Sequence, residues 1–236
     1  MINKIAKIII IVSCFAISSK LESQIIDIET SRKEDFVGTK VSLNIGFDGS
    51  SGTVDRTNYS VGTRFDFNTV NWNRFLIFDY SRREKDESIN EDNTFFHLRF
   101  ARKISSLLAA EFFIQNNEKP IQKIEERKLL GLGLRLSPIK DLRLGFGLFD
   151  ENEKRINLKE RNTTRINSYL NYLFNISENT SFNTLIYFQP DIKDFSEIRS
   201  LLRLGLKVRA TNSFFININY EYAVSYTHLT LPTKCS

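Results

Sequence analysis

Residues 128–149 place a large apolar side chain at every second position on both sides of a turn at Pro138. Gly or Arg occupies most of the positions between them, as in the runs 130–136 and 142–148. A period of two belongs to a β-strand with one apolar face, whereas a helix would spread these leucines around its circumference. The stretch therefore predicts a long β-hairpin.

The same alternation recurs along the chain and predicts eleven strands. They span 37–48, 55–68, 72–83, 93–103, 107–116, 127–137, 141–151, 161–175, 180–189, 196–209 and 213–223. Most exceed the length of a soluble strand and match the roughly 9–11 residues with which a tilted strand crosses a bilayer. The predicted fold class is all-β, an antiparallel up-and-down transmembrane β-barrel. Because closed single-chain bacterial barrels have even strand numbers, we expect twelve strands, the last one missing from this sequence.

The connections between the predicted strands alternate in length, which is typical of an outer-membrane barrel. Five are short and are expected on the periplasmic side: 69–71, 104–106, 138–140, 176–179 and 210–212. Five are longer or more charged: 49–54, 84–92, 117–126, 152–160 and 190–195. The strand 72–83 is ambiguous, because one phase puts Arg74 on the apolar face and the other puts Asp79 there.

The second face of the predicted strands is polar and basic, and in a barrel it lines the lumen. The candidate lumen-lining basic residues are Arg64, Arg99, Arg135, Arg143, Arg165, Arg203, Lys207 and Arg209. An open lumen with this surplus would favour small anions. The alternative is a closed lumen filled by arginines that pair with Glu and Tyr, and we favour it because a barrel of about twelve strands is narrow.

Residues 1–19 read as a secretory signal peptide, a basic start followed by an apolar run too short to span a bilayer. The residues ending at Cys14 resemble a lipobox, so Cys14 is the candidate lipidation site. Residues 20–36 are polar and charged and are predicted to form a periplasmic lead-in.

The C-terminal end of the chain does not continue the pattern of the predicted strands. Residues 224–233 resemble the translation of a transposase adapter used in sequencing libraries, so 224–236 is expected to be a non-native tail. The barrel domain is then 37–223, truncated at its end. Without the tail, the only Cys and His residues are Cys14 and His97.

This inventory argues against enzyme activity. Nucleophilic catalysis needs a Ser or Thr beside a His base, and only His97 is left, on the predicted lumen face beside Arg99. No Cys/His metal set exists, so no metal or other cofactor is expected. The glycines of 131–147 lie within strands rather than in a strand-to-helix turn, so a phosphate loop is excluded. They are expected to leave room in the lumen or to relieve strand curvature.

Residues 93–222 resemble the salt-induced outer-membrane proteins, a bacterial family built on a domain of unknown function. The resemblance lies in the hairpin at 130–136, the strand beginning at Arg165, the segment 177–183, the corner 187–195, the strand 204–208 and the motif 219–222. It implies an outer-membrane barrel and a response to salt, and it brings no catalytic residues.

We therefore predict an exported protein of the outer membrane of a Gram-negative-type bacterium, with a structural or narrow-channel envelope role. Its expected partners are outer-membrane lipids including lipopolysaccharide, the barrel assembly machinery and small anions. The formal charge of +5 suits anionic partners, although a bias toward lysine explains it as well, and no nucleic acid is expected. The alternative is a soluble or lipid-anchored periplasmic β-sheet protein that binds a ligand.

Overall fold

The computed structural model describes residues 25–33, 36–211 and 213–225, and they form an all-β protein. The predicted signal peptide, Cys14 and residues 226–236 of the predicted tail lie outside the described residues. The strands are β1 (Gly38–Ser50), β2 (Arg56–Asn68), β3 (Trp72–Lys85), β4 (Ser88–Lys103), β5 (Leu108–Lys119), β6 (Ile124–Leu136), β7 (Leu142–Arg155), β8 (Arg161–Ser177), β9 (Thr180–Pro190), β10 (Ile198–Arg209) and β11 (Phe215–Ser225). The short 3₁₀ turn η1 (Pro120–Gln122) separates β5 from β6. No helix among these residues has the length and apolarity needed to cross a membrane.

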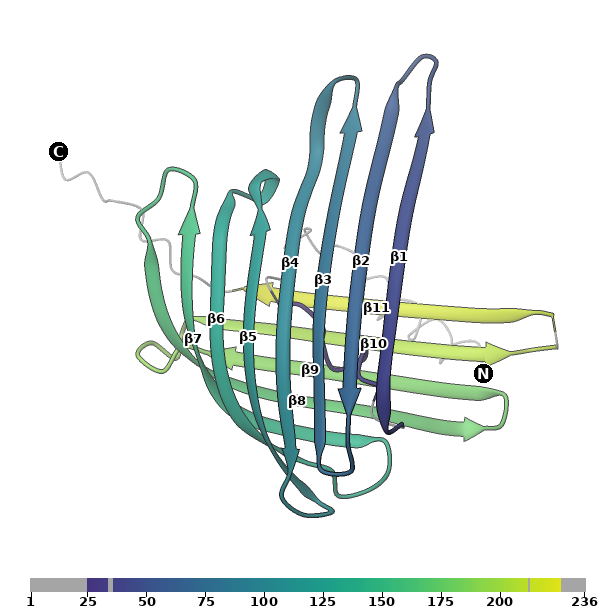
Figure 1. Ribbon diagram of the computed structural model, residues 1–236, viewed down its shortest axis with the longest axis vertical. Coiled ribbons are helices and arrows are strands. Elements are labelled where there is room, and N and C mark those ends of the chain that lie inside the picture. Colours follow the sequence, from purple (N-terminus) through teal and green to yellow (C-terminus); the bar gives the residue numbers. More distant parts are fainter. Residues whose placement is uncertain (1–24, 34–35, 212, 226–236) are drawn as a thin grey trace, which may run out of the picture.

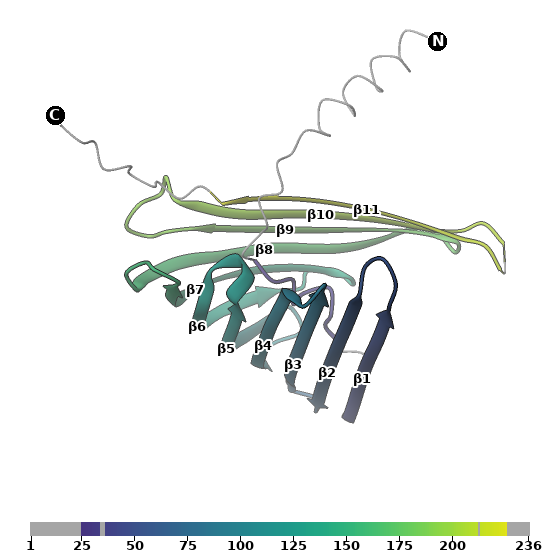
Figure 2. The same cartoon turned by 90° about the horizontal axis from the view of Figure 1, so that it is seen from above.

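The strands form one sheet in sequence order, β1 to β11, and each pairs antiparallel with the next. This confirms the predicted all-β, up-and-down fold. The sheet curls strongly, so that β8–β11 run across the concave side of the first strands (Figures 1 and 2). β1 and β11 form the two edges of the described sheet.

The predicted apolar face is the convex, outward face. Ile45, Leu132 and Phe146 expose 72%, 66% and 65% of their surfaces. The cross-strand register keeps this face continuous, since Leu132 pairs with Leu148 and Leu134 with Phe146. We call this continuous outward surface the apolar belt. On β1, β5, β6 and β7 its outward members are Val41, Leu43, Ile45, Phe47, Phe112, Ile114, Leu130, Leu132, Leu134, Leu136, Phe146 and Leu148.

The structure resolves the ambiguity of β3. Phe75 and Ile77 are buried on the concave side, so Arg74 is the residue that points outward. Its guanidinium lies 4.1 Å from the ring centre of Phe67 and 6.0 Å from that of Trp72. The outward cation is therefore held over aromatic faces at the end of the apolar belt.

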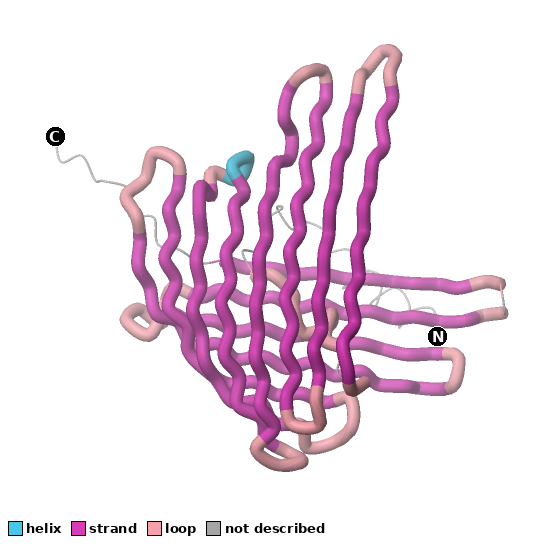
Figure 3. The backbone as a smooth tube through the Cα atoms, in the orientation of Figure 1, coloured by secondary structure: helices cyan, strands magenta, loops and turns pink. Residues whose placement is uncertain are grey.

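The strands extend further toward the longer connections than the sequence predicted. β4 begins at Ser88 rather than 93, and β7 ends at Arg155 rather than 151. The connection predicted at 84–92 shrinks to Asp86 and Glu87, both with positive φ, as in a tight two-residue hairpin turn. Here both faces of the hairpins are polar, so the alternation that marks a strand disappears although the backbone pairing continues (Figure 3).

The glycines of the 128–149 hairpin allow close approach of neighbouring backbone and side chains. A Cβ on Gly147 would lie 2.7 Å from the Cα of Gly133 and closer still to the Leu132 carbonyl oxygen, both of which are backbone. A Cβ on Gly145 would enter the ring of Tyr169. The hairpin therefore depends on glycine at these positions to admit its neighbours.

We expect Gly147→Ala to destabilise the protein by about 1–3 kcal/mol, because the added methyl group would overlap backbone atoms that cannot rotate away. Gly205→Ala is the matched control, since its Cβ would only touch the Asn219 side chain at 3.3 Å. Urea unfolding of both variants checks this. Equal effects of the two substitutions would contradict it.

Candidate functional site: the interior of the curled sheet

The concave side of the sheet holds the chain's own residues 25–33, which we call the inner segment. Ile25 packs in a buried cluster with Tyr169, Leu185, Tyr187 and Leu201. On the other side, Ile28 packs with Phe75 and Ile77 of β3. The sequence predicted only a periplasmic lead-in here and missed these contacts. The inner segment therefore touches strands from both halves of the sheet.

Charged side chains fix the inner segment in place. Glu29, which exposes only 1% of its surface, accepts a hydrogen bond from Arg99 Nη1 at 2.6 Å. Asp27 pairs with Arg203 of β10, and Arg203 also pairs with Glu221 at 2.6 Å. Arg32 of the segment lies 2.8 Å from Glu111 of β5. The segment is thus tied by ion pairs to β4, β5 and β10.

Glu111 is the centre of the ionic cluster at the inner segment. Besides Arg32, its carboxylate lies 3.5 Å from Arg99 and 3.4 Å from Arg135. The Tyr169 hydroxyl donates a hydrogen bond to it at 3.1 Å. A buried carboxylate is tolerated only with such partners, so these groups stabilise one another.

A second buried cluster is centred on Glu151 of β7. Its carboxylate accepts hydrogen bonds from Arg127 Nε at 2.5 Å and Arg165 Nε at 3.0 Å, and it also pairs with Arg199. Glu153 lies 3.2 Å from the Arg199 guanidinium. All five side chains are nearly inaccessible to solvent. This cluster links β6, β7, β8 and β10 through charge.

The predicted basic residues divide into three groups. Arg64, Arg99, Arg135 and Arg165 are buried in the interior and paired with carboxylates: Arg64 with Asp66 at 2.6 Å, and the others as described above. Arg203 is paired with Asp27 and Glu221 while partly exposed, and Arg143 is half-buried near the turn that precedes β7. Lys207 and Arg209 are exposed near the β8–β9 turn, where Arg209 donates to Asn179 Oδ1 at 2.8 Å.

The sequence analysis missed Arg127 and Arg199 as interior residues. Each lies an even number of positions from a predicted interior arginine, Arg135 or Arg203, on the same strand. Because side chains two positions apart on a strand share a face, the spacing could have identified both residues as interior.

His97 has a structural environment. Its ring stacks against Phe75, Phe95 and Phe113 with centroid separations of 5.7, 6.2 and 5.8 Å. Arg99 Nε donates to its Nε2 at 3.2 Å, so Nδ1 carries the proton and donates to Gln115 Oε1 at 3.1 Å. Both ring nitrogens are thus used in holding neighbouring side chains.

A space of about 430 Å³ remains beside the inner segment, against β1–β4. It is lined by Asn44, Arg64, Ile77 and Asp79 among others. Within the described residues, no group of three or more His, Cys, Asp or Glu side chains is arranged to hold a metal ion.

Comparison with known proteins gives a family and a structural similarity to solved β-sheet proteins, of which one is described here. The translocator domain of the autotransporter NalP from Neisseria meningitidis is similar over 83% of this chain and 86% of its own, with 16% identity and a TM-score of 0.43. No curated protein matches the chain. Residues 43–228, most of the chain, match a family whose description does not include the salt-induced name that the sequence suggested. The chain belongs to the family described as "Protein of unknown function, DUF481".

Proposed function

We propose that this protein is an integral β-barrel of the bacterial outer membrane with a structural or narrow-channel role, whose interior is occupied by its own inner segment. One observation carries the proposal. The residue distribution is inverted, because large apolar side chains face outward along the apolar belt while ion pairs fill the interior. In water such an arrangement would expose a large apolar surface and invite association.

The energetics favour lipid as the surroundings of the apolar belt. Each large apolar side chain that moves from water into an apolar medium contributes about 1.5–3 kcal/mol. The buried charges, in turn, have their partners inside the sheet and need no external solvent. A soluble or lipid-anchored binding protein, the alternative predicted from the sequence, would leave the apolar belt uncovered.

The proposal includes closure of the sheet. In the described residues β1 and β11 each pair on one side only. An unpaired strand edge in lipid costs several kcal/mol per exposed backbone group, so membrane-spanning sheets close. We propose closure through one further strand between β11 and β1, which gives the even number typical of bacterial barrels.

The interior supports a closed or narrow lumen rather than a wide pore. Most of the predicted lumen arginines are paired with carboxylates, and aromatic residues such as Phe113 and Phe149 are buried among them. The packing of His97 among phenylalanines supports a role without catalysis. Four further predictions from the sequence belong to this proposal. They are export by the 1–19 signal, insertion by the barrel assembly machinery, passage of small anions and a response to salt.

Membrane embedding is tested by fractionation and by heat-dependent mobility in gels. We expect the exported protein in the outer-membrane fraction and a faster-running folded form before boiling. Leu132→Arg should reduce insertion, because a cation facing lipid near the bilayer midplane costs about 2–4 kcal/mol. Leu132→Phe is the matched control and should insert normally. A monomeric protein in the soluble fraction, without heat-dependent mobility, would refute the proposal.

A further inference from the structure

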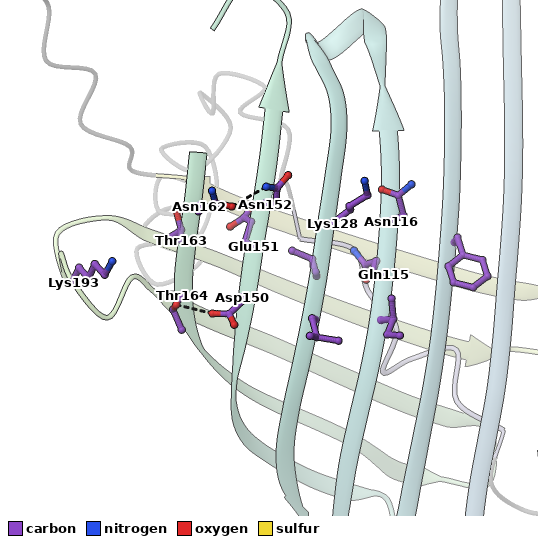
Figure 4. A pocket seen from close by; sticks show the side chains of 14 residues that line it. Gln115, Asn116, Lys128, Asp150, Glu151, Asn152, Asn162, Thr163, Thr164 and Lys193 are labelled. Atoms are coloured by element: carbon purple, nitrogen blue, oxygen red, sulfur yellow. Dashed lines mark hydrogen bonds between the residues drawn. The ribbon is translucent and has the colours of Figure 1, made fainter. Parts of the chain in front are cut away.

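A groove of about 630 Å³ lies on the outward face, where β5–β8 meet the loop between β9 and β10 (Figure 4). It is located at the end of the apolar belt nearest the longer connections. Its lining residues come from the five neighbouring strands β4–β8 and from that loop, and the register places Leu130 opposite both Ile114 and Asp150. The groove therefore crosses the boundary between the apolar belt and the polar hairpins above it.

The lining changes character across this boundary. The apolar part is formed by Phe96, Ile114 and Leu130, which are outward residues of β4, β5 and β6. The polar part comprises Asn116, Lys128, Asp150, Asn152, Asn162, Thr164 and Lys193. A ligand that fills the groove must therefore have an apolar portion and a polar portion.

Hydrogen bonds hold part of the polar lining ready for a ligand. Thr164 Oγ1 donates to Asp150 Oδ1 at 2.6 Å, and Asn152 Nδ2 donates to Asn162 Oδ1 at 2.8 Å (Figure 4). These contacts leave the second carboxylate oxygen of Asp150 and the amide donors of Asn162 for other partners. Asn116 Oδ1 is buried without a hydrogen-bond partner among the described residues. A buried acceptor without a partner is costly, and a hydroxyl donor in the groove would remove that cost.

Two lysines add positive charge to the polar part. Lys193, on the β9–β10 loop, has no carboxylate within ion-pair distance among the described residues. Lys128 lies 2.7 Å from Glu126 at an exposed position, where an ion pair is weak and exchangeable. Both ammonium groups can therefore bind a phosphate.

We propose that this groove binds the phosphorylated sugar headgroup of an outer-leaflet glycolipid. Sugar hydroxyls bind Asp150 and the side-chain amides of Asn116 and Asn162, while both amide hydrogens of Asn152 stay with Asn162 and Glu160. Phosphate groups bind Lys193 on one side of the groove and Lys128 on the other (Figure 4). The acyl chains lie against Ile114, Leu130 and the apolar belt. The inference rests on the proposed function, because it takes the groove to lie at the lipid headgroup level.

The chemistry of the lining separates this ligand from a simple phospholipid. An anionic headgroup without several hydroxyls would meet the Asp150 carboxylate without compensation. A free phosphorylated sugar would leave the apolar part of the groove uncovered. A phosphorylated glycolipid satisfies both parts at once.

Binding is measured on the full chain, purified in neutral detergent and verified by heat-dependent mobility. The probes are lipid A, phosphatidylglycerol and glucosamine 6-phosphate, titrated separately and followed by native mass spectrometry. We expect lipid A to bind at least about 10-fold more tightly than either other probe, which corresponds to about 1.4 kcal/mol. Lys128→Ala/Lys193→Ala and Asp150→Asn should each remove most of that preference.

Lys154→Ala is the matched control, because Lys154 is on β7 outside the groove and pairs with Glu125 at 2.5 Å. It should leave lipid A binding unchanged. Equal binding of lipid A and phosphatidylglycerol, or groove variants that bind like the native protein, would overturn the groove assignment. A protein that shows heat-dependent mobility but no lipid A preference rejects only this inference. A protein without heat-dependent mobility rejects the proposed function itself.

Discussion

Removing the inner segment, residues 25–33, is expected to turn a nearly silent protein into one that conducts ions with a preference for anions. The deletion takes away Asp27 and Glu29, which pair with Arg203 and Arg99, and also Arg32, which pairs with Glu111. It also takes away the side chains that fill the space between the two halves of the sheet. The wall of this region then presents five cations against four carboxylates, an excess of one positive charge. They are Arg64, Arg99, Lys119, Arg135 and Arg203 against Asp66, Asp79, Glu111 and Glu221.

Planar-bilayer recordings under a salt gradient measure both parts of this expectation. The full chain should show rare, small openings, and the deletion variant should show stable conductance with a reversal potential shifted toward that of chloride. Asp27→Asn/Glu29→Gln provides a second test if the deletion disturbs folding, because it loosens the segment without emptying the interior. Ser31→Ala is the control, since among the described residues its hydroxyl touches the wall only through a 3.3 Å hydrogen bond from Arg64. Equal conductance of the full chain and the deletion variant would show that the inner segment does not block the lumen.

Glu151→Gln should destabilise the folded protein by about 3–5 kcal/mol, the typical effect of breaking a buried ion pair by removing one partner. Glu151 lies between Arg127, Arg165 and Arg199, and its carboxylate is almost completely buried. Glutamine preserves the shape but supplies no negative charge to offset three guanidinium groups. Like charges would then repel one another inside the sheet.

Urea-induced unfolding from lipid vesicles, followed by tryptophan fluorescence, measures this loss through Trp72. Glu125→Gln is the control, because it breaks an exposed pair with Lys154 on the same hairpin and should leave the unfolding midpoint unchanged. An unchanged midpoint for Glu151→Gln would mean that Glu153 alone balances the cluster.

The fold was predictable because alternation is a local property. In β6, the run from Leu130 to Leu136 specifies both the strand and the face that points outward. In β4 and β7 the same reasoning failed at the ends, since hairpins that are polar on both faces carry no period of two. The sheet order followed from short connections, which favour antiparallel neighbours.

The candidate site was predictable only in part. Arg99, Arg135 and Arg165 were identified because they share strand parity with other polar residues. Their partners were not, because Glu29 lies 70 residues from Arg99 and Asp27 lies 176 residues from Arg203. The curl of the sheet creates these pairs, and curl depends on backbone twist summed over many strands rather than on any short sequence pattern.

The position of the inner segment also has a consequence for how the molecule is made. One short stretch contacts Arg64 of β2 near one end of the sheet and Arg203 of β10 near the other. These contacts require nearly the entire chain to be in place, and such long-range contacts form late. The first-synthesised part of the described fold therefore forms its contacts among the last, after the strands that surround it are paired.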